Sequence, residues 1–326
     1  MTGGSGFVGG ALVRRLRGRG DEVIGLARSD VAAQHLDSLG ATVVSGHVLD
    51  PDVMATAMSG CDLAFHVAGM NSHCPKDPGA LWRTNVEGPR AAVRAAAHAG
   101  VGRVVVTSSS ATVGEPHGVI GTEETSHRGT YLSLYDRAKH VGEREAFAAG
   151  DETGVEVVTV NPSSVQGPGR SSGNGAIAIA YLNGKLPLFV DTHVSIVDIA
   201  DCVEGHLLAA QHGAPGRRYV LNGATITSLE ALDIVAGLAG VDHRVRILPP
   251  VVARAVGAVS EIAYRPLRRP SPVCRDRIRT ILHGHRYDAS RSERELGLVY
   301  APVANTFERV IDWAVTEGLV RLPPAH

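Results

Sequence analysis

The sequence predicts an α/β fold, with a doubly wound parallel sheet followed by a smaller, mostly helical C-terminal lobe. Over the first 160 residues, short β-branched runs alternate with alanine-rich stretches of helical spacing. Buried parallel strands read as continuous apolar runs joined by helical crossovers, so this alternation favours a doubly wound sheet. The expected strands are 23–26, 41–44, 63–67, 103–106 and 156–160, and the expected helices are 7–19, 85–99 and 134–149.

The strand–helix alternation weakens after Pro162. A glycine- and serine-rich loop covers 167–175, and an apolar run at 219–221 is expected to return to the sheet. Helical patterns occupy 177–183, 228–240, 251–264 and 306–318. We therefore expect a first domain over 1–166 with a return segment at about 195–225, and a second lobe made of 167–194 and 226–326.

Composition narrows the class of partner. The 326 residues have a formal net charge of −1 and only 4% aromatic side chains, which argues against a nucleic-acid partner. The first residues lack the apolar segment of a signal peptide, and no apolar run reaches the roughly 18 residues of a membrane span. We expect a cytoplasmic protein that acts on a small-molecule substrate.

The cysteine and histidine positions predict neither a disulfide nor a metal site. The four cysteines are scattered without CxxC spacing, which favours reduced thiols: Cys61, Cys74, Cys202 and Cys274. Of the 15 histidines, only His283 and His285 lie close together, and no third ligand is near them.

The most lipid-like stretch of the chain is Pro250–Tyr264, which Arg254 and Glu261 interrupt. An amphipathic helix of the small lobe is the main interpretation. The alternative is peripheral contact with a membrane, helped by arginines that follow the stretch: Arg265, Arg268 and Arg269.

A glycine-rich turn opens directly into the first expected helix. Glycines let the backbone turn tightly and approach a pyrophosphate, which then lies on the amides of the helix N-terminus. Two registers fit, one with Gly4 as its first glycine and one with Gly3. An ordinary turn is the alternative, but the position before a helix favours a cofactor site formed by Thr2, Gly3, Gly6, Phe7, Val8 and Gly9.

The next strand indicates the choice of cofactor. A site selective for NAD would carry an acidic residue about 20 residues after the turn, for the ribose 2′-hydroxyl. This strand ends at Arg28 and Ser29 instead. A guanidinium suits a 2′-phosphate, so we expect NADP, with NAD and a merely solvated arginine as alternatives.

Three side chains form a candidate catalytic group. Tyr135 and Lys139 are four residues apart and so share one face of a helix, where an ammonium would lower the pKa of the phenol. Tyr131 competes, but a tyrosine, not a lysine, stands four residues after it. The third member is a hydroxyl of the serine-rich segment 107–114, at the carboxyl end of an expected strand, where ligands bind in open α/β sheets. Capping of the strand end is the alternative role of these hydroxyls.

These motifs resemble the extended short-chain dehydrogenase/reductase superfamily, also described as the NAD-dependent epimerase/dehydratase family, over nearly the whole chain. Within it the chain is most similar to the dihydroflavonol-reductase-like branch, which includes bacterial proteins called hopanoid-associated sugar epimerases. The segments that carry the resemblance are 2–9, 46–50, 66–69, 85–88, 107–114, 135–143, 161–169, 195–200, 287–288 and 295–297.

The resemblance implies a Rossmann fold and a role for each matching position. Tyr135 would be the acid–base, Ser109 the catalytic hydroxyl, and Lys139 would hold the nicotinamide ribose and lower the tyrosine pKa. The remaining cofactor-binding positions that it implies are Arg28, His47, Val48, Ala68, Gly69, Asn85, Thr107, Pro162 and Ser164.

Departures from the family pattern narrow the chemistry. Sugar-nucleotide dehydratases carry Asp-Glu after the catalytic hydroxyl, where this chain has Ser110 and Ala111, so a 4,6-dehydratase is not expected. Ser164 stands where nucleotide-sugar epimerases usually place an asparagine, and Asn161 replaces a common arginine, which weakens the epimerase interpretation. His47 replaces the aspartate that usually bonds the adenine, and Asp50 is not an obvious substitute.

We therefore expect an NADP(H)-dependent oxidoreductase that interconverts a carbonyl and an alcohol, with a sugar epimerase and a non-catalytic cofactor-sensing module as alternatives. The lobe from Leu186 onward and the loop 115–130 should shape the substrate pocket, where Leu188 and Phe189 with Leu186 suggest a hydrophobic ligand. Helices 85–99 and 134–149 could pair in a homodimer, as the resemblance implies.

The resemblance also implies a first strand before Thr2, with Met1 in the place of its last apolar residue. We expect that strand of about 5 residues to be missing from the chain, through a start assigned too late or a truncation.

Overall fold

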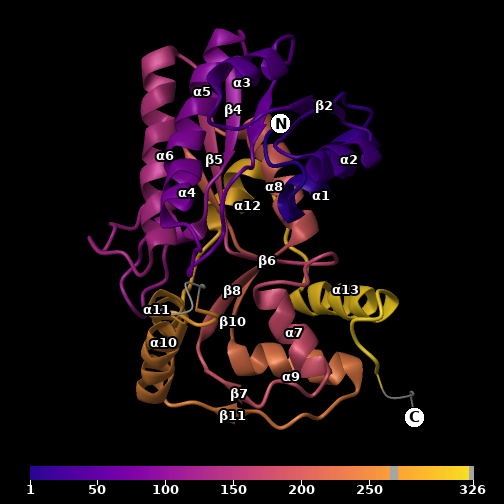
Figure 1. Ribbon diagram of the computed structural model, residues 1–326, viewed down its shortest axis with the longest axis vertical. Coiled ribbons are helices and arrows are strands. Elements are labelled where there is room, and N and C mark those ends of the chain that lie inside the picture. The colour runs from indigo at the N-terminus through magenta and orange to yellow at the C-terminus, as the bar shows by residue number, and fades with distance from the viewer. Residues whose placement is uncertain (265–270, 323–326) are drawn as a thin grey trace.

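The computed structural model describes residues 1–264 and 271–322, in which a parallel sheet forms the larger lobe (Figure 1). Its strands lie in the spatial order β2 (Thr42–Ser45), β1 (Ile24–Ala27), β3 (Ala64–His66), β4 (Arg103–Thr107), β5 (Glu156–Pro162) and β9 (Arg218–Leu221). Met1 and Thr2 join β1 to β3: the Leu26 amide donates to the Met1 carbonyl (2.9 Å) and the Thr2 amide to the Phe65 carbonyl (3.0 Å). The predicted doubly wound α/β fold is confirmed.

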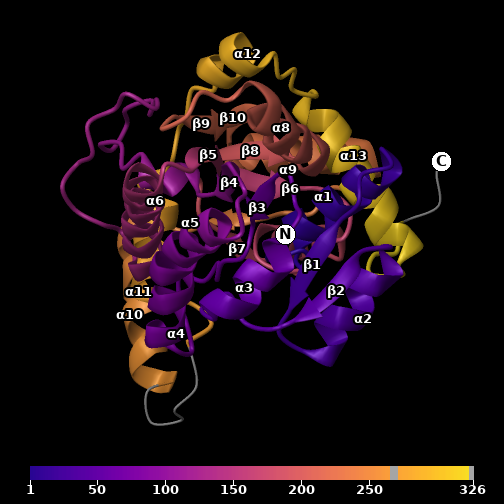
Figure 2. The same cartoon turned by 90° about the horizontal axis from the view of Figure 1, so that it is seen from above.

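Helices cover both faces of this sheet (Figure 2). Val104 and Val106 of β4 pack with α3 (Pro51–Met58), α5 (Gly88–His98) and α6 (Leu134–Thr153), whereas Val105 packs with α1 (Phe7–Gly18) and α8 (Ile199–His212). This follows from the period of two in a strand, since alternate side chains face opposite sides. Both faces of β4 are apolar because both are buried.

The smaller lobe has its own sheet and core. β6 (Ser164–Gln166), β8 (His193–Asp198) and β10 (Ala224–Thr227) form one sheet, and β7 (Leu188–Phe189) pairs with β11 (Arg246–Ile247). The helices around them are α7 (Asn174–Leu182), α9 (Ser228–Ala239), α10 (Pro250–Tyr264), α11 (Arg275–His283) and α13 (Val303–Thr316).

The return to the large sheet is shorter than expected. Within 195–225, only β9 pairs with β5, and α8 covers the sheet, whereas β8 and β10 belong to the small lobe. The arginines expected to help a membrane contact, Arg265, Arg268 and Arg269, lie outside the described residues.

Short elements that the apolar patterns did not reveal complete the fold. These elements include the helices α2 (Asp30–Ser38), α4 (Pro78–Trp82) and α12 (Ser290–Leu296), the π-helical turn η1 (Arg83–Glu87) and the 3₁₀ turn η2 (Ser110–Thr112). Helices α2, α3 and α4 each begin after a residue whose side chain accepts a first-turn amide, namely Ser29, Asp50 and Asp77. In the described part of the chain, no helix is long and apolar enough to cross a membrane.

The expectation that all cysteines are reduced is wrong. Cys74, in the loop after β3, forms a disulfide with Cys274, which precedes α11, across a sequence separation of 200. Cys61 and Cys202 are free. Spacing alone did not reveal the pair because two lobes bring it together, and a cross-link over so long a loop restricts the unfolded chain strongly.

We predict that thiol titration of the denatured, unreduced protein finds two thiols, Cys61 and Cys202, and that reduction raises the count to four. Cys274→Ser should lower the free energy of unfolding by about 2–4 kcal/mol, because it frees the two lobes in the unfolded state. Cys61→Ser is the matched control, expected to leave stability nearly unchanged. Four free thiols before reduction would contradict the pairing.

Candidate active site

A cavity of about 1100 Å³ lies at the carboxyl ends of the sheet strands, where the two lobes meet. Ligands bind at this edge in open α/β sheets. Every residue that the sequence analysis assigned to catalysis or cofactor binding lines this cavity except Thr2. Thr2 is buried behind it, where its hydroxyl contacts His66 Nδ1 (3.0 Å) and accepts from the Ala68 amide (3.4 Å).

The glycine turn adopts the register Gly3–Gly6–Gly9. Gly3 has φ +70°, and a Cβ there would lie 2.5 Å from the Ala68 nitrogen. A Cβ on Gly9 would lie 2.1 Å from the Gly3 carbonyl oxygen, so the turn must be free of side chains. No side chain caps α1 at Gly6, which leaves first-turn amides directed at the cavity. The turn can therefore hold an anion such as a pyrophosphate.

Beyond the glycine turn, at the end of β1, the cavity is lined by a cationic side chain. Arg28 follows β1, is exposed and lines the cavity together with His47 and Val48. Ser29 and Asp50 both cap helices, where each accepts a first-turn amide. Among the described residues, no acidic side chain pairs with Arg28.

Asn85 fixes the middle of the cavity. Its side-chain oxygen accepts from the Met70 amide and its nitrogen donates to the Met70 carbonyl, both at 2.9 Å. This pair of hydrogen bonds holds the loop that contains Ala68 and Gly69. Gly142 permits the arrangement, since a Cβ there would meet the Asn85 carbonyl oxygen at 1.9 Å.

Tyr135, one residue into α6, receives a side-chain hydrogen bond from Ser109 at the end of β4. Burial raises the pKa of the Tyr135 phenol; the Ser109 hydrogen bond and the charge of Arg170 lower it, but by less. The expected lowering by Lys139 is therefore not the dominant effect in this structure. A phenol with a raised pKa stays protonated at neutral pH.

Lys139 is buried beside the tyrosine, and its Nζ donates to the Thr107 carbonyl (2.8 Å). Burial lowers the pKa of the Lys139 ammonium to about 8, while the nearby Glu143 carboxylate opposes that shift. Asn161, which replaces a common family arginine, donates to Glu143, to the Thr112 hydroxyl (2.8 Å) and to the Ser109 carbonyl (3.2 Å). The replacement therefore supports the floor of the site.

Arg170 and His73 are among the cavity residues that were not anticipated. Arg170, in the glycine-rich loop after β6, lies over the Phe7 ring at 5.6 Å and acts electrostatically on Tyr135. His73 meets Tyr135 edge-on, with ring centroids 5.4 Å apart. The only sequence signal for Arg170 is a lone cation among glycines and serines next to a matched motif.

Apolar side chains line one part of the substrate half of the cavity, and polar side chains such as Arg170, Arg277 and His285 line the rest. Phe189 lines this half as expected, but Leu186 and Leu188 do not, and the loop 115–130 contributes no lining residue, so its expected role was wrong. The apolar side chains of this half include Ile177, Phe189, Val194, Leu232, Val235, Phe307 and Val310.

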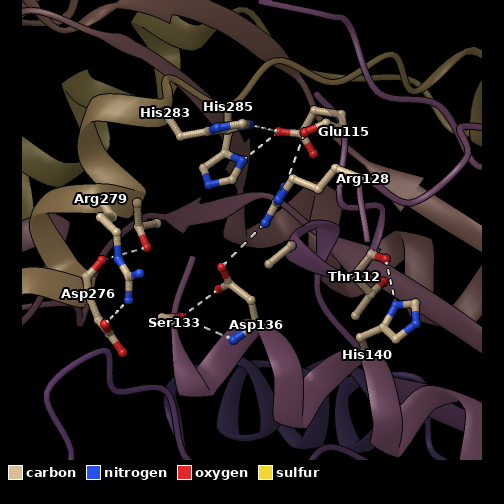
Figure 3. A network of polar contacts seen from close by, with 12 residues as sticks. Thr112, Glu115, Arg128, Ser133, Asp136, His140, Asp276, Arg279, His283 and His285 are labelled. Carbon is tan, nitrogen blue, oxygen red and sulfur yellow. Dashed lines mark hydrogen bonds and ion pairs between the residues drawn. The ribbon is translucent and has the colours of Figure 1, made fainter. Parts of the chain in front are cut away.

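The loop 115–130 instead brings a carboxylate to the two neighbouring histidines (Figure 3). Glu115 Oε1 lies 2.6 Å from His285 Nδ1 and 3.4 Å from His283 Nε2, so the expectation that no third ligand is nearby was wrong. The three side chains could hold a metal ion. The Arg128 guanidinium also donates to the Glu115 carbonyl (3.1 Å) and would repel a cation, so we describe the group as a hydrogen-bonded cluster.

Known proteins resemble the chain over nearly its whole length. A family model described as the NAD dependent epimerase/dehydratase family matches residues 1–221. A putative dihydroflavonol 4-reductase from Synechocystis sp. is 32% identical, covering 98% of this chain and 95% of that protein. Sterol demethylase protein B from Methylococcus capsulatus is 32% identical over 98% of this chain and 99% of its own. A solved nucleoside-diphosphate-sugar epimerase from Pseudomonas aeruginosa shares the fold, with a TM-score of 0.79, 21% identity and 98% coverage of both chains.

The Glu115 cluster yields a prediction about pH. Burial alone would raise the pKa of the Glu115 carboxyl, but its contacts with His283 and His285 outweigh burial and hold that pKa at about 2, below its usual 4.5. Because the folded pKa is the lower one, this stabilisation is present above about pH 4.5 and is lost as the pH falls towards 2. It is on the order of 3 kcal/mol at neutral pH.

Urea unfolding should therefore show Glu115→Gln to be less stable than the wild type at neutral pH, with a difference that shrinks as the pH falls below about 4.5. Glu204→Gln, which alters an exposed pair with Arg15, is the control and should change little. A difference independent of pH would contradict the ionic account.

Proposed function

The chain belongs to the NAD-dependent epimerase/dehydratase family, and we propose that it is an NADP(H)-dependent oxidoreductase that interconverts a ketone or aldehyde with an alcohol. The observation that carries this proposal is the hydrogen-bonded pair of Ser109 and Tyr135, which lines one cavity together with the glycine turn and the apolar part of the substrate half.

The residues present fit a nicotinamide dinucleotide. The side-chain-free turn at Gly3, Gly6 and Gly9 leaves room for a pyrophosphate, and Lys139 lies where a ribose hydroxyl could accept from its ammonium. Arg28, without an acidic neighbour, favours the 2′-phosphate of NADP over the ribose of NAD. When bound, the cofactor would supply or take up the hydride.

The protein's own part in the reaction is to place and move a proton. A carbonyl oxygen within reach of both hydroxyls would accept hydrogen bonds from Ser109 and Tyr135, and Tyr135 would pass its proton to that oxygen as the alcohol forms. A phenol whose pKa is raised favours this donating role. Lys139 keeps a positive charge near the site as the phenolate appears.

The site has no Asp-Glu pair of the kind that drives elimination in sugar-nucleotide dehydratases. Ser110 and Ala111 follow the catalytic hydroxyl, and Asp136 is the one acidic residue that lines the described cavity. Its carboxylate accepts from the Ser133 hydroxyl (2.9 Å) and lies 3.9 Å from Arg128, so it is already engaged. A dehydratase is disfavoured for this reason.

The substrate class follows from the apolar part of the substrate half. Burying apolar surface favours a lipophilic carbonyl compound over a sugar linked to a diphosphate. The relative named sterol demethylase protein B agrees with such a class.

A sugar epimerase is the second candidate, because two cations, Arg170 and Arg277, line the substrate half and could hold a diphosphate. An epimerase leaves the amount of reduced cofactor unchanged over a cycle, whereas a reductase consumes it. Absorbance of the reduced nicotinamide during turnover of ketones and nucleotide sugars separates the two.

The assembly and the location of the protein are further expectations. Helices α5 and α6 lie side by side (Figure 2) and would pair with their counterparts in a homodimer. The cytoplasmic location stays a prediction, and the disulfide stands against it, because such bonds persist in oxidising compartments.

We predict that Tyr135→Phe lowers kcat for carbonyl reduction about 100-fold or more, because it removes the proton donor. NADPH affinity, measured by fluorescence titration, should be retained. Tyr131→Phe is the matched control: Tyr131 packs on His127 outside the cavity, so its loss should leave kcat nearly unchanged. Retained reduction by Tyr135→Phe would refute the assignment.

We also predict that Arg28→Ala weakens NADP binding about tenfold or more and spares NAD, since it removes a charge-assisted contact with the 2′-phosphate. Calorimetric titration with both cofactors measures this. Arg14→Ala removes an exposed arginine from α1 outside the cavity and should affect neither cofactor. Equal losses for NADP and NAD would rule out the role.

A further inference from the structure

Helix α10 exposes a continuous apolar face. Val251 is 72% exposed, Val259 64% and Ile262 66%, and Val252 and Val256 are exposed between them. These positions, with exposed Ala255 and Ala263, share one side of the helix at 100° per residue. Of the exposed residues of this helix, Arg254 alone is charged.

The opposite side of α10 is already packed, which fixes the orientation of the helix. Ala253 is buried against Val190 and Ile278, and a Cβ on Gly257 would lie 3.0 Å from Ile278. Glu261, beside this packed side, accepts from the Arg275 amide of α11 (2.8 Å). The helix therefore packs on the rest of the protein without the exposed valines. They form a surface, which we call the α10 face.

The α10 face lies in the most basic part of the chain. Residues 243–286 contain ten arginines against two acidic residues, Glu261 and Asp276, whereas the whole chain has a net charge of −1. Five of these arginines are exposed in the described residues. Arg275 pairs with Glu261 and Arg279 with Asp276, whereas Arg244, Arg246 and Arg254 have no acidic partner there.

We propose that the α10 face docks on an anionic lipid bilayer, with the helix lying in the plane of the interface. An apolar stripe bordered by arginines matches that surface in two ways, because acyl chains take the valines and anionic headgroups take the guanidinium groups. A second copy of this chain would set the same positive charge against itself, so self-association is the poorer match.

The α10 face lies close to the substrate half of the cavity. Val190 and Ile281 line the cavity and belong to the same apolar cluster as Ala253 of α10. The helix and one layer of side chains thus separate the docked face from the substrate half of the cavity, so a lipophilic compound in the bilayer would be close to its site. Docking itself does not depend on the proposed reaction.

Co-sedimentation with vesicles tests the proposal on the full chain. The protein should sediment with vesicles of phosphatidylcholine and phosphatidylglycerol, less with phosphatidylcholine alone, and less as salt is added. Val256→Glu/Val259→Glu should reduce binding about tenfold or more, since it places charge in the stripe. Val299→Glu, at an exposed valine outside α10, is the matched control and should bind like the wild type.

A second pair of substitutions separates charge from apolar contact. Arg244→Gln/Arg246→Gln should weaken binding to the anionic vesicles by about fivefold for each arginine removed and leave thermal unfolding unchanged. Wild type that does not sediment with anionic vesicles, or a double valine variant that binds as well as wild type, would overturn the proposal. So would a wild-type dimer that the valine variant dissociates in gel filtration without lipid, because the face would then join two copies.

Discussion

The close approach of the glycine turn to the end of β3 is the constraint on which the rest of the site depends. Gly3 lies so near the backbone of Ala68 that no side chain fits between them. On the buried side of this contact, the Thr2 hydroxyl lies within hydrogen-bond distance of His66 Nδ1. Burial lowers the pKa of His66 to about 3, so its imidazole is neutral. With the turn seated there, the first amides of α1, the end of β1 and the loop held by Asn85 all face one cavity.

Below the reacting groups, buried charges balance one another. Lys139 gives its hydrogen bond to a backbone carbonyl, while Glu143 is held by Asn161 and, at 3.4 Å, by Arg218. A buried ammonium and carboxylate would each be costly alone, and these partners give each of them a hydrogen bond in the floor of the site. Tyr135 is then the group at the cavity wall whose proton can move.

The strands of the large sheet and the helices α1, α5 and α6 could be predicted because local spacing determines them. Two registers of the glycine turn fitted the sequence, and most cofactor-binding positions followed from the family resemblance. Features that depend on contacts between distant segments could not be predicted from the sequence. Cys274 meets Cys74 only when the lobes pack, and Glu115 reaches His283 and His285 from a loop with no pattern of its own. The pKa of Tyr135 was misjudged because a sequence shows a neighbouring lysine but not how strongly burial opposes ionisation.

Transfer of deuterium from NADPH that carries deuterium at both positions of nicotinamide C4, followed by mass spectrometry of the product, tests the proposed chemistry most directly. With a lipophilic ketone as substrate, the label should appear on the carbinol carbon of the alcohol, with one cofactor oxidised for each alcohol formed. A product that carries no label, or a nucleotide sugar that is epimerised while the amount of reduced cofactor stays constant, would contradict the reductase assignment.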